Sequence, residues 1–157
     1  MKTRELQTLW WDWLGTSERL LRSLYEQTAA LTLRDVARVE RIQPEIDGMM
    51  SHLRDLDGKA VACAQKLAEE LGTEPSLRSL ASVLDKAEAQ QLQGLGNRVT
   101  VAARNVQEVL QRNRILIENE MIYINGTMTL VAKAVTEKQG NFGMKRTAPA
   151  VLVDQVA

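Results

Sequence analysis

The feature that most constrains this fold is an apolar pattern that repeats every seven residues between residues 86 and 135. Three rows of apolar side chains follow it, beginning at Leu92, Leu95 and Ala103. A seven-residue repeat keeps one helix face apolar and favours left-handed coiled-coil packing. About 50 residues at ~1.5 Å each form a helix roughly 75 Å long. The chain must therefore cover one side of an unusually long helix.

An N-terminal stretch over residues 3–30 also has apolar side chains at helical spacing. Its stripe runs from Leu6 through Trp10 and Trp13 to Leu24, and this spacing predicts one amphipathic helix. We expect Trp10 and Trp13 in the core. Trp11 projects off the stripe, so it is a candidate interface residue.

A second helical stretch is predicted to end at residue 71, where Gly72 supplies a left-handed stop. We place its start at Thr32, with Asp35 as an acid in the first turn and Val36 on the buried face. Pro44 lies inside the stretch and removes a backbone donor, which predicts a kink rather than a break.

The composition agrees with an all-α fold, because 9 Gly, 3 Pro and 4% aromatics are too few for an all-β domain. We predict an elongated antiparallel helical bundle, coiled-coil-like, with a very long C-terminal helix. Residues 1–135 would form a single helical domain. Residues 136–157 lack helical periodicity and contain Gly140, Gly143 and Pro149, which predicts a flexible C-terminal tail.

The charge balance argues against a nucleic-acid partner, since 20 Lys and Arg residues offset 20 Asp and Glu residues. No apolar run approaches the roughly 18–20 residues that span a bilayer, so we expect no membrane insertion. The single cysteine, Cys63, cannot form an intrachain disulfide. A reducing compartment, the cytoplasm, is the predicted location.

No motif for catalysis, metal or cofactor emerges. His52 is the only histidine and has no neighbours at a zinc-ligand spacing. Cys63 lies between alanines on a helix, as a small packed side chain does. Gly94 and Gly96 are a fragment of a dinucleotide fingerprint without its strand, and we interpret them as a weak point in the long helix. A helical enzyme is the least supported class.

Residues 115–135 carry apolar side chains off the bundle stripe as well as on it. A helix that is apolar nearly all round needs full burial or another partner, and methionine suits surfaces that repack around different ligands. The alternative is that neighbouring helices or a dimer mate cover this segment. A polar row at Asn113, Glu120 and Thr127 would then set register in a coiled-coil oligomer. The candidate binding residues are Ile115, Leu116, Ile117, Met121, Ile122, Ile124, Met128 and Val131.

This segment resembles the C-terminal signature of the FlgN family of bacterial flagellar export chaperones. Residues 113–118 read NRILIE, and Tyr123 and Ile124 follow with an apolar continuation. The layout of the helices and the ending Leu152-Val153-Asp154 are also similar to the family.

The resemblance implies a cytosolic, non-enzymatic chaperone that binds the hook–filament junction proteins FlgK and FlgL before export. It also implies that the client is captured through its C-terminal region, which forms an amphipathic helix on binding. Contact with the flagellar export apparatus and a homodimer remain open. The alternatives are a type III chaperone with another client and a structural coiled-coil oligomer.

Overall fold

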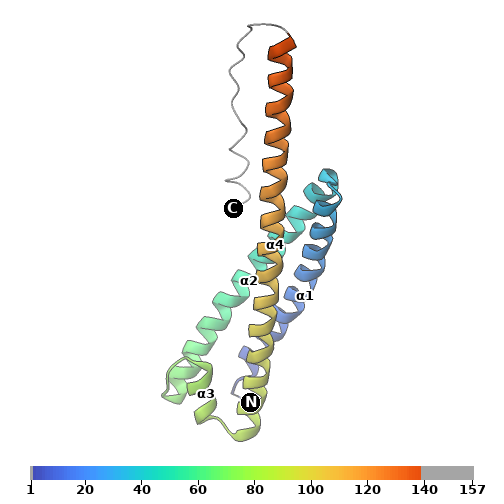
Figure 1. The fold of residues 1–157 in the computed structure, drawn as a ribbon. Helices are drawn as coiled ribbons and strands as arrows, with labels where there is room; N and C mark the ends of the chain where they lie inside the picture. Colours follow the sequence, from blue (N-terminus) through green and yellow to red (C-terminus); the bar gives the residue numbers. More distant parts are fainter. Residues whose placement is uncertain (1, 139–157) are drawn as a thin grey trace.

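The computed structural model describes residues 2–138, with side chains to residue 136, and the chain there is almost entirely helical. The helices are α1 (Arg4–Thr32), α2 (Val36–Leu71), α3 (Leu77–Val83) and α4 (Lys86–Lys138). α1 and α2 form an antiparallel hairpin, short α3 turns the chain, and α4 runs back alongside α1 (Figure 1). The predicted all-α, elongated bundle with a very long C-terminal helix is confirmed.

α4 continues three residues beyond the predicted boundary at residue 135. The predicted flexible tail over 136–157 falls almost wholly outside the described residues. The division into a helical domain and a tail therefore stays a prediction.

α2 begins and ends at backbone features that its sequence supplies. Gly72 adopts φ +68°, the left-handed stop expected after Leu71. The prediction that Thr32 caps the helix was wrong, because Thr32 is the last residue of α1 and Asp35 is the cap. The Asp35 carboxylate accepts the Arg38 N–H at 3.2 Å, which satisfies a donor left free at the helix start. The helix passes Pro44 without a break.

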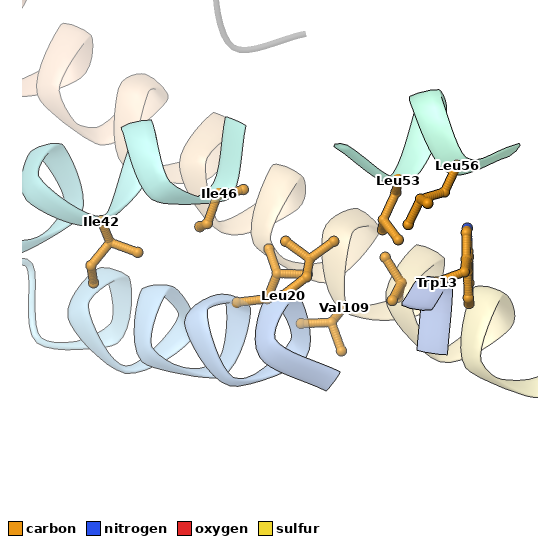
Figure 2. Packing of buried hydrophobic residues seen from close by; sticks show 9 residues of the cluster. Trp13, Leu20, Ile42, Ile46, Leu53, Leu56 and Val109 are labelled. Carbon is orange, nitrogen blue, oxygen red and sulfur yellow. The ribbon is translucent and has the colours of Figure 1, made fainter. Parts of the chain in front are cut away.

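The core lies where α1 packs between α2 and α4. Figure 2 shows Leu20 of α1 among side chains of both neighbours, with Trp13 packed beside Leu53 and Leu56 of α2. Leu20 is completely buried, and full burial of a leucine contributes about 1.5–3 kcal/mol before entropy is counted. Trp10, half-buried, packs against a second cluster around Leu6, at the end of the bundle that holds α3. The core position predicted for Trp13 is thus confirmed, while Trp10 lies at the edge of the core.

The first residues of α1 are tied to the start of α4. The backbone N–H and the hydroxyl of Thr3 both donate to the buried Glu88 carboxylate, at 2.8 and 2.7 Å. The Asp85 carboxylate in turn accepts the Glu88 N–H at 2.9 Å and caps α4. These bonds fix the α3 end of the bundle.

From its sequence context, Gly96 was interpreted as a weak point in α4. In the structure it is a point of close approach between helices. A Cβ atom there would lie 2.6 Å from Leu77 Cδ2 and 3.4 Å from the Trp10 ring. A Cβ atom at Gly94 would meet nothing within 4 Å. Gly96 therefore allows close packing between helices, whereas Gly94 faces open space.

These surroundings predict opposite effects for two alanine substitutions. Gly94→Ala should raise the free energy of unfolding by about 0.5–1 kcal/mol, because alanine favours the helix. Gly96→Ala should lose that gain or lower stability, because the Leu77 side chain must move. Urea denaturation of the two variants tests this comparison. Equal stabilisation by both would show that no close packing exists at Gly96.

Candidate helix-binding site

A buried polar bracket fixes α4 against the α1–α2 hairpin. The amide nitrogen of Asn113, which is 1% exposed, donates to Leu24 O at 2.9 Å and to Gln27 Oε1 at 3.0 Å. Its oxygen accepts the Thr28 hydroxyl at 2.6 Å. Gln27 then donates to Gln43 Oε1 of α2 at 2.7 Å. Since each of these amides is paired, the network locks one register among three helices.

An apolar groove lies beside this bracket. α1 packs against both α2 and α4, but in the described chain no Cα atom of α2 comes within 8 Å of one of α4. The gap between them forms a groove of about 1090 Å³, with the end of α1 at its base. Its apolar lining consists of Ala30, Leu31, Val36, Val39, Ile46, Met50, Leu110, Ile117, Met121 and Ile124.

Arg34 closes the groove at the α1–α2 turn. Its backbone adopts φ +55°, an uncommon conformation for a residue other than glycine. Its Nε atom lies 3.3 Å from Glu120 Oε2, and its guanidinium lies 4.1 Å from the centroid of the Tyr123 ring. The ion pair and the cation–π contact hold the turn against α4.

Past this contact α4 extends beyond the hairpin, as its orange end shows in Figure 1. Large apolar side chains remain exposed there, including Ile122, Leu130 and Val131. A soluble protein that exposes such a patch commonly uses it to bind a partner.

The structure divides the eight predicted binding residues between two surfaces. Three of them line the groove: Ile117, Met121 and Ile124. Outside the groove lie the half-buried Leu116 and four exposed residues: Ile115, Ile122, Met128 and Val131. They form one continuous stretch of α4.

Sequence reasoning missed the opposite wall of the groove. Val36, Val39 and Met50 come from α2, and Val36 was predicted on the buried face. That prediction was wrong, because Val36 is 58% exposed. The apolar pair at the start of α2 was visible in the sequence, but its spacing did not reveal that α2 and α4 separate there.

Trp11 is half exposed, and the guanidinium of Arg98 lies 5.5 Å from its ring centroid. Its predicted interface role stays a prediction. Burial raises the pKa of the Cys63 thiol, and nearby Glu5 adds to the effect. A raised pKa disfavours the reactive thiolate, as expected of a packing residue.

Within residues 2–138, no group of three or more His, Cys, Asp or Glu side chains could hold a metal ion. None of the helices described over this range is both long and apolar enough to cross a membrane.

A helical protein whose longest helix carries an apolar face past its own bundle belongs to the class that binds partner segments. The family model described as FlgN protein matches residues 1–149, and the chain belongs to the FlgN family. Its members are cytoplasmic, non-enzymatic chaperones that bind FlgK and FlgL for flagellar export. No curated protein and no solved structure matches the chain.

Because Asn113 is at the centre of the polar bracket, shortening its side chain should cost considerable folding stability. Asn113→Ala would leave the buried Gln27 oxygen without its donor and open a small cavity, so stability should fall by roughly 2–3 kcal/mol. Asn105→Ala, at an exposed position of the same helix, is the matched control and should change stability by less than about 0.5 kcal/mol. Urea denaturation measures both. Similar small losses would show that the bracket does not stabilise the bundle.

Proposed function

We propose that the exposed apolar end of α4, between Ile115 and Val131, binds the C-terminal amphipathic segments of FlgK and FlgL and keeps them unpolymerised and competent for export. The observation that carries this proposal is the exposure of large aliphatic side chains on the part of α4 that extends beyond the helical bundle. An amphipathic segment that orders on this face would bury its own apolar side, which would otherwise be free to polymerise.

The energetics fit a reversible chaperone complex. Fully burying an isoleucine yields about 1.5–3 kcal/mol, and association costs about 4–15 kcal/mol, so binding requires several such contacts along the segment. Part of that gain is lost in ordering the client segment. Met121 and Met128 have flexible, polarisable side chains that can repack around two different clients.

A single charge on this apolar end of α4 should weaken client binding strongly. Ile122 is 68% exposed, so Ile122→Asp should leave folding intact while it opposes burial of the client helix. We expect isothermal titration calorimetry with FlgK and FlgL C-terminal peptides to show micromolar or tighter binding, with a negative heat-capacity change, for the wild type. The variant should bind at least about 30-fold more weakly, a change near 2 kcal/mol.

Val101→Asp is the matched control, because Val101 is also on α4, is 53% exposed and lies within the bundle region. It should retain wild-type affinity. Peptides from flagellin and from the filament cap test the alternative of another client. Equal binding by wild type and Ile122→Asp would remove the side of α4 that carries Ile122 from the site, and light scattering would reveal whether a stable oligomer covers it.

A further inference from the structure

We propose that the groove between α2 and α4 is a second part of the client site, and that it holds the same amphipathic helix between Val36 and Met50 on one wall and Ile117 and Met121 on the other. The inference rests on the proposed function of α4. It adds α2 as a binding element and predicts which charges the client helix must carry.

The shape of the groove suits a helix laid sideways between two others. The axes of packed helices lie about 8–10 Å apart, which brings their facing backbones closer than that. α2 and α4 are held further apart, since their backbones nowhere approach within 8 Å across the described chain. The separation leaves an apolar trough with Leu31 at its base. A partner helix with apolar side chains at positions i, i+3, i+4 and i+7 would insert them there.

The groove is continuous with the α4 face of the proposed function. Ile117, Met121 and Ile124 line the groove, and Met128 and Val131 continue the same stripe of α4 at intervals of four and three residues. A client helix seated on the exposed end of α4 can therefore extend along the same helix into the groove. Binding both surfaces would bury more apolar area than either offers alone.

The rims of the groove carry charge that restricts the occupant. The α2 rim has two exposed acidic residues, Glu40 and Asp47, which are two helical turns apart on the same side of α2. On the α4 rim, Arg114 is paired with Glu118 at 3.2 Å. The occupying helix should thus present basic side chains toward α2, since unlike charges across an interface favour its register.

Val36→Asp tests the groove with little risk to the fold. Val36 is the first residue of α2, where an acidic side chain is favourable because it faces the positive end of the helix dipole. We expect wild-type melting and at least roughly tenfold weaker binding of the FlgK and FlgL peptides, because the charge opposes burial of the client's apolar stripe.

Val61→Asp is a close control, since Val61 is on the same helix, is 58% exposed like Val36 and does not line the groove. It should bind as the wild type does. Wild-type affinity in Val36→Asp would overturn the groove proposal, while the Ile122→Asp result judges the α4 face separately. Absence of binding by the wild-type protein would overturn both.

Methyl-labelled methionines provide a second test in the full chain. Met50 lies on the α2 wall and Met121 on the α4 wall. Addition of the client peptide should shift both signals in an NMR titration. A shift of Met121 without Met50 would restrict the client to α4 and overturn the proposal.

Two further outcomes would assign the groove to another occupant. A Met50 shift that depends on chaperone concentration alone would indicate a second copy of the chain. A Met50 shift on deletion of residues 139–157, without any client, would indicate that the chain's own C-terminal residues lie there. Either result would overturn the proposal.

Discussion

Asn113 marks the position on α4 where packing within the bundle gives way to open apolar surface. On its N-terminal side, Val106 and Val109 are buried against α1 and α2. The groove opens around it, and the exposed apolar face begins within two residues, at Ile115. A buried amide is costly unless paired, so the bracket fixes which part of α4 the hairpin can cover and which part it must leave exposed.

The second constraint is a mismatch of length. α1 has 29 residues and α4 has 53, which at 1.5 Å each correspond to about 44 and about 80 Å. α1, which packs against α4, can therefore cover only about half of it. The seven-residue apolar pattern nevertheless continues through Leu130 and Val131, where the structure supplies no packing partner from the described chain. Such a pattern is useful when a partner helix comes from another molecule.

Membership of the FlgN family means that the protein binds FlgK and FlgL, and the exposed end of α4 is the surface that we propose for this binding. A chaperone for FlgK and FlgL must offer apolar area to a client yet remain folded without it. The architecture separates the two tasks, because the clusters around Leu20 and Leu6 stabilise the bundle and are distinct from the surface beyond Asn113. The proposed client surface can thus change its contacts while the core keeps its packing.

The sequence by itself determined the helices, because apolar spacing and Gly72 specify local structure through the backbone. It also placed Trp13 in the core and pointed to the apolar stretch after residue 115, where the seven-residue repeat continues beyond the helices that could cover it. It could not place Val36, because periodicity identifies an apolar helix face but not what lies opposite. Only the tertiary structure decided that α2 and α4 diverge, that Arg34 closes the gap and that Gly96 leaves room for Leu77, since these depend on contacts between residues distant in sequence.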